Sequence, residues 1–250
     1  MHDLDKERIN KTIADRSNVF YWQTDRAVEP EEAGAIWADR HNYFTDSELF
    51  ERINAHIGDV KLKTLSPFDP NDQTNLGNVS SVRSGILENG ESVIIRSFPK
   101  GVKNGYFHVE SLVADTVRSA GLPSYETIAI HDMTDLDDLS FHVIQKLPDP
   151  AVKTWLNSHP EDEDNIVFQV GKTMAAMHKI TVDGFGPFSN ELAKHGTLKG
   201  LHDTFVTAQL AGLDFNLDVL VKANTITAEQ ATKINGLFTA DNPLLQIDQA

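Results

Sequence analysis

The spacing of apolar residues divides the chain into a helical start, an alternating middle and a helical end. The clearest early helix is TDSELFERINAHIG, residues 45–58, in which Leu49 and Ile53 share one apolar face. Thr45 is a typical cap at its start and Gly58 a typical stop at its end. Two further helices are expected upstream, in DKERINKTIADR and EPEEAGAIWADRH.

The pattern changes to a period of two after a connector rich in Pro, Asp and Asn, SPFDPNDQTN. Two strand-like runs, SSVRSGIL and ESVIIRSF, flank Glu88-Asn89-Gly90, and Asn-Gly is a strong hairpin signal. A helix ending at Gly121 is predicted in YFHVESLVADTVRSAG, followed by strands in TIAIHD and SFHVIQKL. The order strand, strand, helix, strand, strand predicts a small α+β lobe.

From Pro150 onward the pattern is almost entirely helical. AVKTWLNS predicts a short helix and NIVFQVGKTMAAMHKI a long one. The long helix carries a stripe that we expect to be buried: Val167, Val170, Met174 and Met177. The GFG of GFGPFSNELAKHG is predicted to fix a turn between helices, and two more helices are expected over roughly 198–223 and 227–239.

Composition narrows the class of protein. A chain of 250 residues can bury a sizeable core, as one large domain or two modest ones. It has no apolar run of the roughly 18 residues that a membrane span needs, and its charged start is not a secretory signal. The absence of cysteine excludes disulfides and thiolate metal sites, so we expect a cytoplasmic protein. A net charge of −15 without a basic stripe argues against a nucleic-acid partner.

Two constellations in the middle region suit phosphate chemistry. The segment LGNVSSV has small residues that let a backbone approach a ligand, although an ordinary loop has the same composition. Arg96, on the same strand face as Ile94, could pair with Glu110 of the next helix and present its charge to polyphosphate. On these residues alone, an exposed strand arginine beside a solvated helix glutamate is the favoured interpretation.

Three other segments have simpler structural explanations. FHVIQKLPDP is a strand that breaks at Pro148, either as a linker between lobes or as a hinge whose backbone groups contact a flat ring. His178 lies near a helix C-terminus, where a capping or packing role is favoured over catalysis. The acidic stretch HDMTDLDDL, residues 131–139, has enough carboxylates for a metal, but its place between two strands favours a solvated turn.

Taken in order, these segments resemble the aminoglycoside phosphotransferase and choline kinase-like family, which has a protein-kinase-like fold. The resemblance runs from about Leu76 to the C-terminus. It rests on VIIRSF, VESLVADTVRSAGLPSYETIAIHD, FHVIQKLPD and, above all, VGKTMAAMHKITVDGFGPF. The last is similar to the family's "lg..la.lH.i...GfG" segment.

The resemblance implies a nucleotide site in the small lobe. LGNVSSV would be the nucleotide-covering loop, with Gly77, Ser80 and Ser81 nearest the phosphates. Arg96 stands where the family carries a lysine or, in many members, an arginine, with Glu110 as its partner.

The same resemblance implies where the base and the acceptor bind. Gln145, Lys146 and Leu147 would line the adenine through their backbone groups, and the helices after Gly184 would contribute to acceptor binding.

The terminal LLQIDQA aligns with the family's catalytic strand, which resembles "LVHGDLHPGN". Asp248 would then be the catalytic base, with Gln246 and Ile247 in place of the family's His and Gly. The asparagine and aspartate that hold Mg²⁺ in the family have no counterpart in this chain, so no metal ligands are assigned. We therefore expect catalysis by the chain alone to be severely impaired, and a complementing C-terminal fragment could supply the missing ligands.

The expected architecture is α+β, a kinase-like two-lobe fold with an incomplete helical lobe. The predicted boundaries are a helical extension over 1–65, a nucleotide-binding lobe over 66–148 and a large lobe over 149–250. The expected activity is ATP-dependent transfer of phosphate to a hydroxyl of a small molecule, aminoglycoside-like or amino-alcohol-like. Two alternatives are a non-catalytic nucleotide- or protein-binding remnant of a kinase and a helix-rich α+β domain of merely similar architecture.

Overall fold

The computed structural model describes residues 44–68, 80–98, 106–134, 138–148, 151–210 and 213–238. The two helices expected before residue 44 lie outside these residues. So do Gly77 and the terminal segment with Gln246, Ile247 and Asp248.

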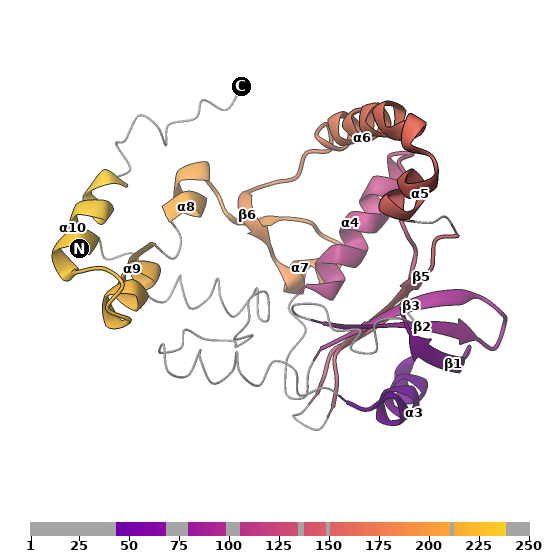
Figure 1. The fold of residues 1–250 in the computed structure, drawn as a ribbon. Coiled ribbons are helices and arrows are strands. Elements are labelled where there is room, and N and C mark those ends of the chain that lie inside the picture. Colours follow the sequence, from indigo (N-terminus) through magenta and orange to yellow (C-terminus); the bar gives the residue numbers. More distant parts are fainter. Residues whose placement is uncertain are drawn as a thin grey trace.

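The centre of the fold is a five-stranded antiparallel sheet of order β1-β2-β3-β5-β4 (Figure 1). Its strands are β1 (Leu62–Pro67), β2 (Ser81–Leu87), β3 (Ser92–Ser97), β4 (Thr127–His131) and β5 (Phe141–Gln145). The four predicted strands and the turn at Asn89-Gly90 are confirmed, with Gly90 at φ +90°. Strand β1 was not predicted, and the domain boundary expected after residue 65 falls inside it.

Two helices lie on opposite faces of this sheet, α3 (Asp46–His56) and α4 (Phe107–Ser119) (Figure 1). Side chains along β3 alternate between the two faces of the sheet, so the strand contacts both helices. Val93 and Ile95 point to the α3 face and are completely buried in a core that includes Ile53. Arg96 points to the other face, toward α4, where it meets Glu110. Because α3 and β1 complete this core, they belong to the same packed unit as the other four strands.

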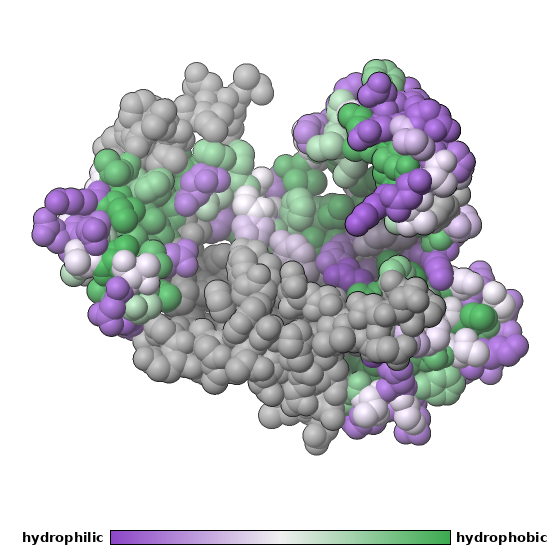
Figure 2. Space-filling model, in the orientation of Figure 1, coloured by the Kyte–Doolittle hydropathy of each residue, from purple (hydrophilic) through white to green (hydrophobic). Residues whose placement is uncertain are grey.

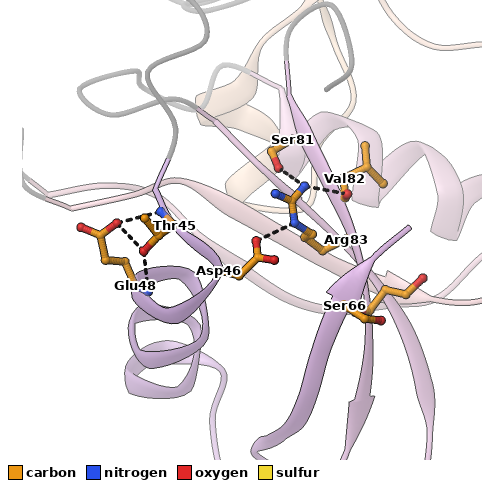
Figure 3. Close-up of polar contacts among 8 residues, drawn as sticks. Thr45, Asp46, Glu48, Ser66, Ser81, Val82 and Arg83 are labelled. Carbon is orange, nitrogen blue, oxygen red and sulfur yellow. Dashed lines mark hydrogen bonds and ion pairs between the residues drawn. The ribbon is translucent and has the colours of Figure 1, made fainter. Parts of the chain in front are cut away.

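The start of α3 is held by the predicted cap (Figure 3). The Thr45 hydroxyl accepts a hydrogen bond from the Glu48 N–H at 3.3 Å, and Glu48 Oε2 accepts one from the Thr45 N–H at 2.7 Å. These reciprocal bonds satisfy backbone donors that have no partner within the helix.

We expect Thr45→Ala to lower the free energy of unfolding by about 1 kcal/mol, because alanine cannot accept the bond from the Glu48 N–H. Thr45→Ser keeps the hydroxyl and should stay within a few tenths of a kcal/mol of the wild type, as measured by urea denaturation. Equal stability of the alanine and serine variants would contradict a stabilising cap.

The second half of the chain is mostly helical, but it contains a small hairpin that the sequence did not predict. Its helices are α5 (Val152–Ser158), η1 (Pro160–Asp162), α6 (Glu163–Met177), α7 (Asn190–Lys194), α8 (Phe205–Leu210), α9 (Leu213–Lys222) and α10 (Ala228–Leu237). Strands β6 (Phe185–Phe188) and β7 (Gly200–His202) pair with each other. The helical stretch predicted over roughly 198–223 is therefore wrong at its start, where β7 lies, whereas the helix predicted over roughly 227–239 is confirmed.

Glycine explains why a strand forms at residue 200. A Cβ atom at Gly200 would lie 2.3 Å from the Phe185 backbone nitrogen, so the two strands can approach only because that atom is missing. Gly184 and Gly186 have φ values of +77° and +80°. The GFG segment was predicted to fix a turn between helices, but its last two residues form the start of strand β6.

The apolar stripe predicted to be buried on α6 is exposed. Val167, Val170, Met174 and Met177 are 40–64% accessible, and Phe168 beside them is 67% accessible. Figure 2 shows apolar surface among the polar residues of α5 and α6. Helical spacing predicts which residues lie on one face, but it does not predict what covers that face. In the described part of the chain, no helix is both long and apolar enough to cross a membrane.

Candidate functional site: the ion pair between β3 and α4

The predicted pair between Arg96 and Glu110 is confirmed. Arg96 extends from β3, and Glu110 lies in the first turn of α4. One guanidinium nitrogen, Nη1, contacts Glu110 Oε2, and the other, Nη2, lies 3.4 Å from Oε1. Both side chains are about 30% accessible, so the pair is anchored at the sheet surface and still open to solvent. Such a two-point contact fixes the plane of the guanidinium.

The aromatic ring of Phe107 packs against the Arg96 guanidinium. The Arg96 Cζ atom lies 5.4 Å from the centre of the Phe107 ring, within range of a cation–π interaction. Phe107 is completely buried and stacks on Phe98 with a centroid distance of 4.9 Å. Arg96 is thus oriented by Glu110 on one side and by a rigid apolar support on the other.

A buried histidine completes the site, and the sequence analysis missed it. His142, on β5, is fully buried, and its Nε2 atom lies 2.9 Å from the Thr127 hydroxyl. Its Nδ1 atom is 3.8 Å from Glu110 Oε2, too far for a direct hydrogen bond but close enough for electrostatic attraction. The sequence did contain a signal for this residue. His142 lies inside the apolar run FHVI, where a buried polar ring needs a hydrogen-bonding partner.

Burial and the neighbouring charges shift the pKa values of several residues at this site. Burial alone would raise the pKa of Glu110, but the His142 ring and the Arg96 charge hold that pKa below its ordinary value. Burial lowers the pKa of His142, against the opposite pull of the Glu110 carboxylate. Burial and the Glu110 charge raise the pKa of Tyr125. At neutral pH the site therefore combines a cation, an anion and a neutral imidazole.

Of the two serines predicted near phosphate, Ser81 lies on the opposite face of the sheet from Arg96. Ser80 and Ser81 are both buried. Ser81 pairs in register with Ser97, so it faces α3, whereas Val82 shares the face of Arg96. The Ser81 hydroxyl accepts a hydrogen bond from Arg83 Nη1 at 2.8 Å (Figure 3). The structure thus separates the Ser81 side chain from Arg96.

The proposed hinge residues Gln145, Lys146 and Leu147 lie at the exposed end of β5. The Gln145 N–H donates to the Glu126 carbonyl at 2.8 Å, and the Lys146 N–H donates to the Ser92 carbonyl at 3.1 Å. Among the described residues, the Leu147 N–H meets no acceptor. The contacts predicted between the backbone groups of these three residues and an adenine stay a prediction; of their N–H groups, that of Leu147 is the one not already bonded to a described residue.

The acidic stretch between β4 and β5 is not simply a solvated turn. Asp138 is buried, with its carboxylate 2.7 Å from His131 Nε2. Asp132 lies 2.8 Å from Lys194 Nζ and 3.1 Å from His108 Nε2, and so connects α7 with α4. The prediction of a solvated turn is therefore wrong for these two carboxylates.

Two other features lie outside the Arg96–Glu110 site. His178 occupies the C-cap position of α6 and is exposed, so the predicted cap position is confirmed and a packing role is not. A hollow of about 590 Å³ lies between α9 and α10 and is lined by residues including Asp214 and Asp218. It is at the opposite end of the described molecule from the sheet (Figure 1), so it does not adjoin the ion pair.

Comparison of the chain with protein-family models, with curated proteins and with solved structures found no match.

Proposed function

We propose that the chain is a kinase-like nucleotide-binding protein that transfers the γ-phosphate of ATP to a hydroxyl of a small molecule. One observation carries the proposal: a cation on the third strand is held by both oxygens of a glutamate from the following helix. Protein kinases use the same arrangement of strand cation and helix glutamate to hold ATP phosphates. An aminoglycoside-like or amino-alcohol-like acceptor follows from the sequence resemblance.

The residues at the pair suit a polyphosphate. A guanidinium has five N–H donors, and Glu110 engages only one edge of the Arg96 group, which leaves donors for phosphate oxygens. Because Phe107 and Glu110 already orient the group, little side-chain entropy is lost on binding. The Leu147 N–H would contribute a donor to the base.

Magnesium supplies neutralisation of the phosphate charge in this chemistry. No residue in the described ranges is assigned as its ligand, and Asp248, the proposed base, lies outside them. We therefore derive the binding of the nucleotide and no step of the transfer.

A non-catalytic binding protein is the alternative, and two observations favour it. The Ser81 hydroxyl, predicted to face phosphate, is buried on the opposite side of the sheet from Arg96. The five exposed apolar residues of α6 form the kind of surface that protein partners cover.

Thermal unfolding in the presence of ATP tests the nucleotide site. At about 100 times its dissociation constant, ATP should stabilise the wild type by about 2.7 kcal/mol, and Arg96→Ala should remove most of this gain. Arg83→Ala is the matched control, because Arg83 is also a strand arginine paired with a carboxylate but faces α3. It should keep the ATP-dependent shift even if its own melting temperature falls.

The outcomes separate the alternatives. An ATP-dependent shift with transfer of labelled γ-phosphate to an aminoglycoside or amino alcohol supports the phosphotransferase. A shift without transfer favours the non-catalytic protein. Absence of any shift at millimolar ATP, or an equal loss in the Arg96 and Arg83 variants, would refute the nucleotide site.

A further inference from the structure

Three potential metal ligands converge on the face of the sheet away from Arg96. His56 lies in the last turn of α3, His131 ends β4, and Asp138 lies three residues before β5. His131 pairs in register with Phe141, whose ring belongs to the core under α3, so both side chains lie on that face. In the sequence His56 is 75 positions from His131 and 82 positions from Asp138, so the fold brings distant residues together.

The donor atoms of the three side chains lie within 4.8 Å of one another. His131 Nε2 is 2.7 Å from Asp138 Oδ2, and His56 Nε2 is 4.0 Å from Asp138 Oδ1. The two imidazole rings stack with a centroid distance of 3.8 Å and an angle of 14° between planes. Both imidazoles therefore direct the same type of nitrogen at the two oxygens of one carboxylate.

The carboxylate is fixed in place by its own backbone. Asp138 Oδ1 accepts a hydrogen bond from the Leu139 N–H at 2.8 Å, and Oδ2 accepts one from the Thr134 N–H at 3.0 Å. Although burial acts in the opposite sense, the His131 ring and these N–H groups lower the pKa of Asp138 to about 2. The side chains of His131 and Asp138 are 16% and 12% accessible, so an ionised, oriented carboxylate lies in a sheltered place.

We propose that His56, His131 and Asp138 bind one divalent transition-metal ion, with Zn²⁺ as the best match. Imidazole nitrogens suit zinc and its neighbours in the first transition row, whereas magnesium and calcium prefer oxygen ligands throughout. Three protein ligands leave a fourth tetrahedral position for water. The 40% accessibility of the His56 side chain provides an approach from solvent.

Binding requires the two imidazole rings to leave their stacked arrangement, because the in-plane lone pairs of near-parallel rings do not converge on one ion. Zinc–nitrogen bonds of about 2.0 to 2.1 Å in a tetrahedron place ligand atoms about 3.3 Å apart. The exposed His56 ring would therefore rotate and move toward Asp138. The ion would take the place of the hydrogen bond between His131 and Asp138, and any proton on the ligand nitrogens is released.

The bound ion would connect α3 directly to the β4–β5 hairpin. It would act as a structural clamp on the small lobe, independent of the nucleotide site on the other face. Because the unfolded chain does not hold the three ligands together, metal binding should raise the stability of the fold.

Zinc titration of the chelator-treated full chain tests this site, by calorimetry and by melting temperature in the absence of nucleotide. We expect one equivalent of Zn²⁺ to bind and to raise the melting temperature. His56→Gln removes the most exposed ligand with least risk to folding and should weaken binding by at least about tenfold. Asp138→Asn should weaken it as well.

His195→Gln is the matched control, because His195 is an exposed histidine at the end of α7, outside the cluster. It should bind Zn²⁺ as the wild type does. Co²⁺ in place of zinc should give the intense visible absorption of a four-coordinate site in the wild type and the control, and not in His56→Gln. Failure of the wild type to bind Zn²⁺, or equal binding by His56→Gln, would overturn the proposal, whatever the result with ATP.

Discussion

Replacing Phe107 with alanine is expected to lower the free energy of unfolding by about 3 to 5 kcal/mol. The ring is completely buried between the sheet and α4. It stacks on Phe98, lies 5.2 Å from the His142 ring and supports the Arg96 guanidinium. Its removal leaves a cavity at the point where three elements meet, and the neighbours cannot fill such a space without leaving their own positions.

Urea denaturation monitored by circular dichroism checks this expectation, and Phe168→Ala is the matched control. Phe168 is a helix phenylalanine that is 67% accessible on α6, so its truncation should change stability by less than about 0.5 kcal/mol. A loss below about 1 kcal/mol in the Phe107 variant would contradict the packing described here. At temperatures where that variant is still folded, we also expect a weaker ATP-dependent shift, because Arg96 loses its support.

Strands β2 to β5 and α4 were predictable from the sequence because their signals are local. Alternation in ESVIIRSF, the Asn89-Gly90 turn and the helical spacing around Glu110 each depend on neighbouring residues alone. The same local rules placed Arg96 on a face of β3 and Glu110 at the start of the next helix. That the two side chains would pair was implied by the resemblance to the kinase-like family.

The features that were missed depend on residues far apart in the chain. The alternation of β2 does not say which of its faces meets α3, so Ser81 was expected near the phosphates although its side chain lies on the other side of the sheet from Arg96. The β6–β7 hairpin forms because Gly200 allows two backbones to approach, and no periodicity reports that contact. His56, His131 and Asp138 likewise come together only through the packing of α3 on the hairpin.

Acid is expected to destabilise the fold through His142 before it affects the carboxylates of the site. Burial holds the pKa of His142 below the value of about 6.5 that it has in the unfolded chain. Between those two pKa values the unfolded chain binds a proton that the native protein does not, so stability falls as the pH falls. The slope for one such proton is at most about 1.4 kcal/mol per pH unit.

The charges that face His142 determine how wide this pH window is. Glu110 on α4 raises the pKa of His142, while Arg96 on β3 and His108 on α4 lower it. Glu110 has a lowered pKa of its own, so it contributes stability that is lost only at still lower pH, as the pH falls from the ordinary value of 4.5 through that lowered pKa. The two groups therefore act in the same direction but in successive ranges of pH.

Urea denaturation at intervals between pH 7 and pH 5 measures the contribution of His142. His142→Gln should show a shallower loss of stability over this range than the wild type, whatever its stability at pH 7, because its side chain does not titrate. His178→Gln, a substitution at an exposed helix end, should keep the wild-type slope. Equal slopes in the wild type and the His142 variant, or an NMR titration in which the native His142 ring protonates above pH 6.5, would show that the ring is not held neutral by burial.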